Sequence, residues 1–187
     1  MDAKLIVNGV EVNLGHDELS GICGSLSDSE KNEGIFHELG KSSSEAVREN
    51  VAWKKSLSKE TAKLLLNDTS IEVLREIVGH ETAKDLITKE DINRLIALQD
   101  TTIMVTIAEG VYEYDNCDET FIYAALINQA DPQVRYQLAQ DSEMPKFLMK
   151  QLTNDQDLEV SEEAKETLEE IIEDEEEDLE ASGRHMY

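Results

Sequence analysis

A short sequence pattern that recurs along the chain constrains its fold more than any other feature. It combines an acidic or Ser residue, an aliphatic residue, Arg and an aliphatic–small pair, and its clearest copies are Asp131–Ala139 and Ser44–Ala52. Looser copies lie around Leu74, where Arg is kept, and around Ile103 and Val160, where Met or Ser replaces it. In each copy an aliphatic residue precedes the Arg position. From one copy to the next, these aliphatic residues are 27, 29, 31 and 26 residues apart. A drifting period in this range is typical of helical repeats, which bury their apolar faces only against neighbouring repeats.

Between the copies, apolar residues recur at helical spacing, and polar residues stand where helices would begin. Ser44 is the expected N-cap of one helix, and Thr88 followed by Asp91 has the offset of a capping box. Only two prolines and nine glycines interrupt the chain. We therefore predict an all-α fold in which about five two-helix repeats form an α-solenoid over residues 42–172.

The N-terminal stretch has a different pattern, with strand-like runs in residues 4–14 on either side of Asn8-Gly9. Asn-Gly readily takes the two positive φ values of a type I′ turn, so these residues predict a β-hairpin. A two-stranded hairpin is marginal in water by itself. We expect it to pack against the first helices, so that residues 1–41 cap the end of the solenoid.

The repeat residues resemble a known family. Asp131–Ala139, followed by Met144–Leu152 and Asp155–Val160, is similar to the leucine-rich repeat variant, a relative of HEAT and armadillo repeats. The resemblance covers roughly residues 42–172. It implies paired short helices stacked into a right-handed superhelix, a role in protein interaction, and no shared reaction. One member of the family holds an iron–sulfur cluster with an N-terminal cysteine cluster, which Cys23 alone does not reproduce.

The chain is strongly acidic, with a formal net charge of −25. Residues 155–180 hold fifteen acidic residues against one basic residue, and residues 173–178 are six consecutive acids. Such blocks are usually solvated, so we predict that residues 173–187 form a disordered acidic tail. Nucleic-acid affinity depends on Lys and Arg displacing counterions, which argues against direct DNA or RNA binding. An acidic surface instead favours a basic partner.

Other short motifs indicate neither a cofactor nor a reaction. Cys23 and Cys117 form no CxxC pair, and the His residues lack a partner at metal-ligand spacing. No nucleophile elbow, phosphate loop or dinucleotide motif occurs. No signal peptide or long apolar run is present. We therefore expect a cytoplasmic protein that is not an enzyme, binds no metal or cofactor, and does not enter a membrane.

The recurring Arg48, Arg75 and Arg135 have two interpretations. They could line a binding groove, or each guanidinium could bind an Asp or a backbone carbonyl in the turn to the next repeat. Planar bidentate pairing suits Arg, and Asp68, Asp100, Asp131 and Asp155 occur near those turns. We favour the second interpretation, in which these residues are scaffold.

Four aromatic residues are the candidate partner-binding side chains: Trp53, Tyr112, Tyr114 and Tyr136. Trp53 and Tyr136 fall near the same position of their repeats, beside the buried stripe. Tyr112 and Tyr114 lie in the longest turn between helices, and insertions in repeat proteins often map to the binding face. Aromatic side chains that are half exposed on a repeat surface are frequent interface anchors, although they also fill gaps in small cores.

These observations predict a protein–protein interaction scaffold that binds a basic segment of another protein. The alternative is an acidic inhibitor that imitates nucleic acid and occupies a DNA- or RNA-binding protein. The two hypotheses differ in whether the acidic tail at residues 173–187 is needed for activity: the nucleic-acid mimic requires it to inhibit its target, and the scaffold binds its partner without it. The sequence leaves the identity of the partner and the oligomeric state open.

Overall fold

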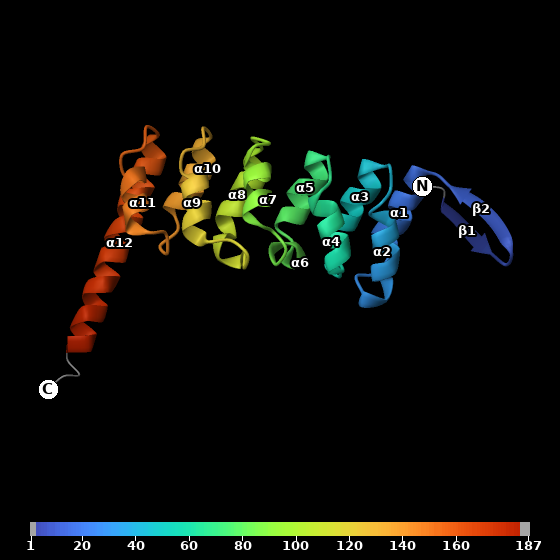
Figure 1. Cartoon of the computed structure of the whole chain (residues 1–187), viewed down its shortest axis with the longest axis horizontal. Helices are drawn as coiled ribbons and strands as arrows, with labels where there is room; N and C mark the ends of the chain where they lie inside the picture. The colour runs from blue at the N-terminus through green and yellow to red at the C-terminus, as the bar shows by residue number, and fades with distance from the viewer. Residues whose placement is uncertain (1–2, 184–187) are drawn as a thin grey trace. The chain divides into compact units, whose positions relative to one another are not determined.

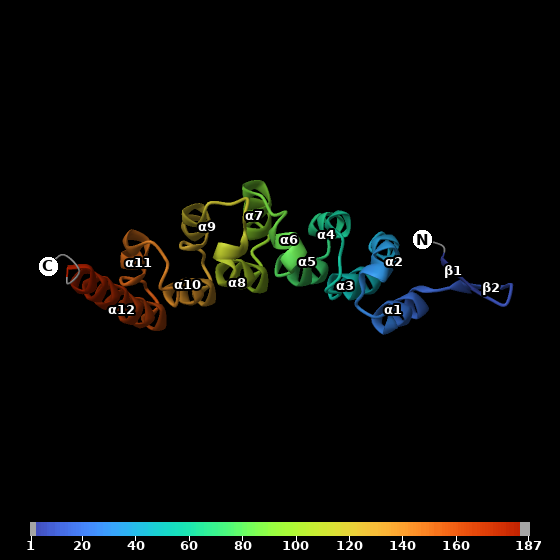
Figure 2. The same ribbon diagram turned by 90° about the horizontal axis from the view of Figure 1, so that it is seen from below.

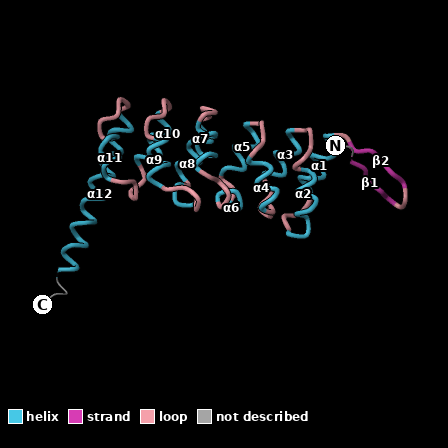
Figure 3. Tube along the Cα trace, viewed as in Figure 1, coloured by secondary structure: helices cyan, strands magenta, loops and turns pink. Residues whose placement is uncertain are grey.

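The computed structural model describes residues 3–183 and places most of them in α-helices joined by short turns (Figure 1, Figure 3). The β-structure in this part of the chain is one two-stranded antiparallel sheet. The predicted mostly helical fold with an N-terminal hairpin is confirmed. The chain divides into two compact units, Met1–Ile87 with Glu113–Asn116, and Thr88–Tyr112 with Cys117–Tyr187.

The hairpin consists of β1 (Ala3–Val7) and β2 (Val10–Leu14). Val7 pairs with Val10 across the turn, and Asn8 and Gly9 have φ values of 52° and 81°. Two consecutive positive φ angles are what a type I′ turn requires, and Asn and Gly are the residues that adopt them most readily. The turn prediction from Asn8-Gly9 is therefore confirmed.

The prediction that the hairpin packs against the first helices is wrong. Gly15 alone joins β2 to α1 (His16–Ser25), and the hairpin extends away from that helix (Figure 1). One connecting residue is too short to fold the sheet back over the helix. Five apolar side chains of the hairpin are 45–64% exposed: Leu5, Ile6, Val7, Val10 and Val12.

The first unit arranges its helices in two alternating rows (Figure 2). α3 packs between α1 and α5, while α4 contacts α2, α5 and α6. The row containing α3 therefore begins at His16, inside the stretch that the sequence assigned to a cap. Besides α1, the helices of this unit are α2 (Glu33–Leu39), α3 (Glu45–Ala52), α4 (Lys59–Leu66), α5 (Ile71–Val78) and α6 (Glu81–Lys84).

The second unit repeats this alternation. α10 packs between α8 and α12, and α9 contacts α7, α8 and α10. Its fully buried side chains include Ile107, Tyr123 and Val134. The helices of this unit are α7 (Lys89–Ile96), α8 (Thr101–Glu109), α9 (Glu119–Leu126), α10 (Pro132–Ala139), α11 (Lys146–Leu152) and α12 (Leu158–Gly183).

Polar side chains begin many of these helices by accepting a backbone hydrogen bond. The Thr88 hydroxyl accepts from the Asp91 amide and the Asp91 carboxylate accepts from the Thr88 amide, which confirms the predicted capping box. Ser44 occupies the N-cap position of α3, but its side chain makes no capping hydrogen bond. Ser70 and Asp131 cap α5 and α10. Capping side chains close to each N-terminus thus determine where most of the helices begin.

The acidic end of the chain continues as helix instead of forming the expected disordered tail. α12 runs through the block of acids at residues 173–178 and ends at Gly183. Residues 184–187, the rest of the predicted tail, lie outside the described residues. No helix within residues 3–183 is both long enough and apolar enough to cross a membrane.

Candidate functional site

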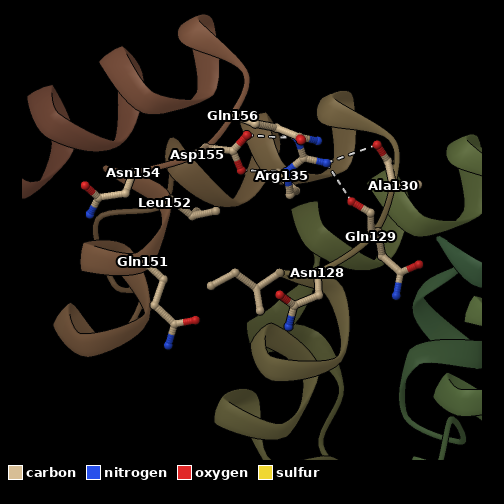
Figure 4. A pocket seen from close by; sticks show the side chains of 10 residues that line it. Asn128, Gln129, Ala130, Arg135, Gln151, Leu152, Asn154, Asp155 and Gln156 are labelled. Atoms are coloured by element: carbon tan, nitrogen blue, oxygen red, sulfur yellow. Dashed lines mark hydrogen bonds and ion pairs between the residues drawn. The ribbon is translucent and has the colours of Figure 1, made fainter.

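One arginine–aspartate pair in the second unit joins two helix-connecting turns. The Arg135 Nε and Nη2 donate to the two carboxylate oxygens of Asp155 at 2.7 and 2.9 Å (Figure 4). The Arg135 Nη1 donates to the carbonyls of Gln129 and Ala130 at 2.6 and 3.1 Å. Both charged side chains are buried, and the hydrogen bonds from Arg135 hold the pKa of Asp155 below its usual value. We name Arg135 and Asp155 the second clamp.

The first unit contains the same arrangement, which we name the first clamp. The Arg48 Nε and Nη2 donate to Asp68 at 2.5 and 2.9 Å, and Nη1 donates to the Ser42 carbonyl at 2.9 Å. In both clamps the Asp follows the Arg by 20 residues, and a carbonyl acceptor precedes it by six. The scaffold interpretation is confirmed for Arg48 and Arg135, and it stays a prediction for Arg75.

A hollow of about 350 Å³ lies beside the second clamp (Figure 4). Arg135 already donates to Asp155 and to two carbonyls, so its guanidinium is not free to hold an anion. The hollow therefore offers neutral polar groups, which suit neither acid–base nor nucleophilic chemistry. Its carboxamide side chains are Asn128, Gln129, Gln151, Asn154 and Gln156.

Of the four predicted aromatic residues, the structure places two in the first unit. Trp53 is 64% exposed at the C-terminal end of α3, where a partner could reach it. Tyr114 is only 2% exposed, so its expected role in partner binding is wrong. A side chain this buried contributes to the core and makes no surface contact.

The expected equivalence of Trp53 and Tyr136 is also wrong. Tyr136 directly follows the clamp residue Arg135 inside α10, whereas Trp53 stands five residues after Arg48 at the C-cap of α3. The residue of α10 that corresponds to Trp53 is its C-cap, Gln140. The two aromatic side chains therefore do not form a repeated row.

Tyr112 belongs to a hydrogen-bonded cluster with Tyr123 and Asp141, which we name the tyrosine cluster. Both tyrosine hydroxyls donate to the Asp141 carboxylate, at 2.7 Å from Tyr112 and 2.5 Å from Tyr123, and they also contact each other. Tyr123 is fully buried, and Tyr112 is 44% exposed. Burial first, and then the bond to Asp141, raise the pKa of the Tyr123 phenol well above its usual value.

Tyr136 lines a second hollow, of about 300 Å³, on the face formed by α8, α10 and α12. Val105, Pro132 and Val160 supply its apolar wall. The Tyr136 hydroxyl donates to Glu163 at 2.9 Å, and this bond raises the pKa of the phenol. Asp157 and the exposed Glu159 also line the hollow, and no Lys or Arg does.

A neighbouring hollow of about 230 Å³ is lined by Tyr112 and Asp141, together with the exposed Glu109. Gln137 lines both hollows, so the structure brings Tyr112 and Tyr136 to adjoining parts of one face. We name these two hollows together the acidic groove. Its apolar surface, tyrosine rings and carboxylates suit a segment that carries both apolar and basic side chains.

Several residues of this face are not among the predicted site residues. Tyr123 and Asp141 are 18 residues apart and belong to no motif. Val105, Pro132 and Val160 belong to copies of the repeat pattern, which by itself predicts helices and no binding site. Their positions in three copies of the repeat pattern, on α8, α10 and the start of α12, are the signal that could have placed them on one face.

Comparison with known proteins leaves the family open. No protein-family model matches the chain, and no curated protein is significantly similar to it.

Proposed function

We propose that this chain is a helical-repeat scaffold that binds a basic segment of another protein in the acidic groove. The repeat assignment extends the resemblance to the leucine-rich repeat variant, with the helix pairs stacked as an α-solenoid. It is supported by the two clamps, which share their residue types, their 20-residue offset and their third bond to a carbonyl. Independent folds would not be expected to reproduce all three features.

The acidic groove is the observation that carries the binding proposal. Tyr136, Pro132 and Val105 offer apolar surface to the stem of a Lys or Arg side chain, and Glu159 offers a carboxylate to its head. A tyrosine ring also attracts a cation placed over its face. The net charge of −25 would raise the encounter rate with a basic partner, and added salt would lower it.

Binding of synthetic peptides tests this proposal. In fluorescence anisotropy, peptides that alternate Leu with Lys or Arg are expected to bind, and matched Leu–Glu peptides are not. Tyr136→Ala should weaken binding at least about tenfold, because it removes a central anchor. Glu159→Gln should weaken it about two- to fivefold, because rim charges contribute little.

Two matched variants show whether the groove is the site. Tyr136→Phe keeps the ring and should retain most of the affinity. Glu169→Gln removes the same charge from an exposed position of α12 that does not line the groove, and should bind as the wild type does. Equal losses in Glu159→Gln and Glu169→Gln would mean that net charge alone attracts the peptide. Unchanged binding by Tyr136→Ala would contradict the proposal.

The nucleic-acid-mimic hypothesis keeps one supporting observation. Exposed acids at Glu162, Glu166, Glu169 and Glu173 recur at each turn of α12, about 5 Å apart along its axis. This row of negative charge lies on a helix, which places the charges more regularly than a disordered tail would.

Deleting residues 173–187 separates the two hypotheses. A groove binder should keep its affinity for basic peptides, because the groove lies between α8 and the first turns of α12. A nucleic-acid mimic should lose much of its ability to displace DNA or RNA from a nucleic-acid-binding protein, as measured in a competition assay. Loss of peptide binding on deletion would count against the groove.

A further inference from the structure

The N-terminal hairpin has one wholly apolar face and one largely polar face. Cross-strand partners share a face, and the register pairs Leu5 with Val12 and Val7 with Val10. Leu14 continues this apolar face. The residues between them form the opposite face, which contains Ile6 and the ion pair from Lys4 to Glu11, at 2.8 Å. This alternation is typical of an antiparallel sheet that packs one face against a core and exposes the other face to solvent.

Nothing in the described part of the chain covers the apolar face. Leu5, Val7, Val10 and Val12 are each 45–63% exposed. Hairpin residues account for five of the twelve large hydrophobic side chains exposed in the described residues, although the hairpin spans only residues 3–14. An isolated two-stranded sheet is marginal in water, and packing against another layer is what usually stabilises it. The hairpin therefore has the composition of one layer of a two-layer structure.

We propose that this apolar face packs against the same face of a second copy of the chain. The two hairpins would form a small β-sandwich with their polar faces outward. A face that contacts its own copy about a two-fold axis must be complementary to itself, and an uninterrupted aliphatic surface meets that requirement. This proposal does not depend on the acidic groove or on its partner.

Charge favours a second copy here over the basic partner proposed for the groove. Lys4 and Glu11 are the charged residues within residues 3–14, and they neutralise each other, whereas the whole chain carries −25. No acid lies on the apolar face to select a basic segment. Two copies of so acidic a chain repel each other, and a neutral hairpin lets them meet where that repulsion is smallest.

The buried area predicts a weak dimer. Burying a fully exposed Leu or Val removes roughly 60–120 Å² of apolar surface from water. The apolar face contains five Leu and Val side chains per copy, and each would bury about half of that area. The two copies together would then bury on the order of 500 Å². Stable interfaces bury about 1,200–2,000 Å², and smaller ones are typical of transient contacts. Association should therefore depend on protein concentration and increase with salt, which screens the net charge.

Sedimentation equilibrium of the full chain over a wide concentration range tests the proposal. The wild-type mass should rise from 21.0 kDa towards twice that value as concentration increases. Leu5→Lys should stay monomeric over the same range, because it places a charge in the apolar face. Ile6→Lys adds the same charge to the opposite face and should associate as the wild type does.

A third variant guards against a misfolded hairpin. Val12→Thr keeps a β-branched side chain that favours strands, and should weaken the dimer while cross-strand contacts in the NMR spectrum persist. A wild-type chain that remains monomeric at the highest concentration and at high salt would overturn the proposal. Equal loss of association in Leu5→Lys and Ile6→Lys would overturn it as well, because the apolar face would then have no special role.

Discussion

Replacing Arg135 by Ala is expected to lower the free energy of unfolding by about 3–5 kcal/mol. The substitution leaves the buried carboxylate of Asp155 without its partner and frees the carbonyls of Gln129 and Ala130. A buried charge that loses its partner keeps its desolvation cost, which is why the effect should far exceed that of a surface ion pair. Urea denaturation followed by circular dichroism measures the loss, and amide hydrogen exchange in α10 and α12 locates it.

Two further variants separate the clamp geometry from its charge. Arg135→Lys keeps a cation but not the planar fork, so it should recover only part of the lost stability. Replacing Arg135 by Met together with Asp155 by Leu removes both charges and should recover most of it, since apolar pairs often substitute well for buried ion pairs. A cost below about 1 kcal/mol for Arg135→Ala would show that the clamp is no more than a surface salt bridge.

The features that the sequence predicted correctly are those with local or recurring signals. Asn8-Gly9 identifies its turn because few other residues adopt two positive φ values. The partners of Arg48 and Arg135 were predictable because the same residue types recur at the same offset in two copies. The hairpin was correctly placed in the sequence, but alternation of polar and apolar residues does not say what covers the apolar side. Its exposure could be found only from the structure.

The exposure of the aromatic side chains could not be predicted from local or recurring signals. Tyr112 and Tyr114 stand two residues apart in one turn, yet Tyr112 is 44% exposed and Tyr114 is 2% exposed. Outside a regular helix or strand, no periodicity assigns a side chain to the core or to the surface, so contacts distant in sequence decide. Tyr136 lies within α10 and lines the acidic groove, and its role in partner binding stays a prediction.

Replacing Asp141 by Ala should be the next most destabilising change, at roughly 2–3 kcal/mol. Asp141 accepts hydrogen bonds from the buried Tyr123 hydroxyl and from Tyr112. Without it, the buried Tyr123 hydroxyl loses its charged acceptor and keeps only the neighbouring Tyr112 hydroxyl, whereas the partly exposed Tyr112 hydroxyl can turn to water. Asp141→Asn retains a carbonyl acceptor and should cost less. Equal stability of Asp141→Ala and the wild type in urea denaturation would show that the tyrosine cluster is incidental.

High pH tests the tyrosine cluster without changing its packing. An unfolded tyrosine loses its proton near pH 10. Folding raises the pKa of the Tyr123 phenol, so the folded chain keeps that proton when the unfolded chain has released it. Stability should therefore be retained below about pH 10 and fall above it, by up to about 1.4 kcal/mol per pH unit for this group. Tyr123→Phe lacks the group, so its stability should fall less steeply than that of the wild type. The difference between the two slopes reports the Tyr123 phenol together with its bonded neighbour Tyr112, whose pKa is raised by burial first and by Asp141. Parallel slopes would place the Tyr123 proton outside the folding equilibrium.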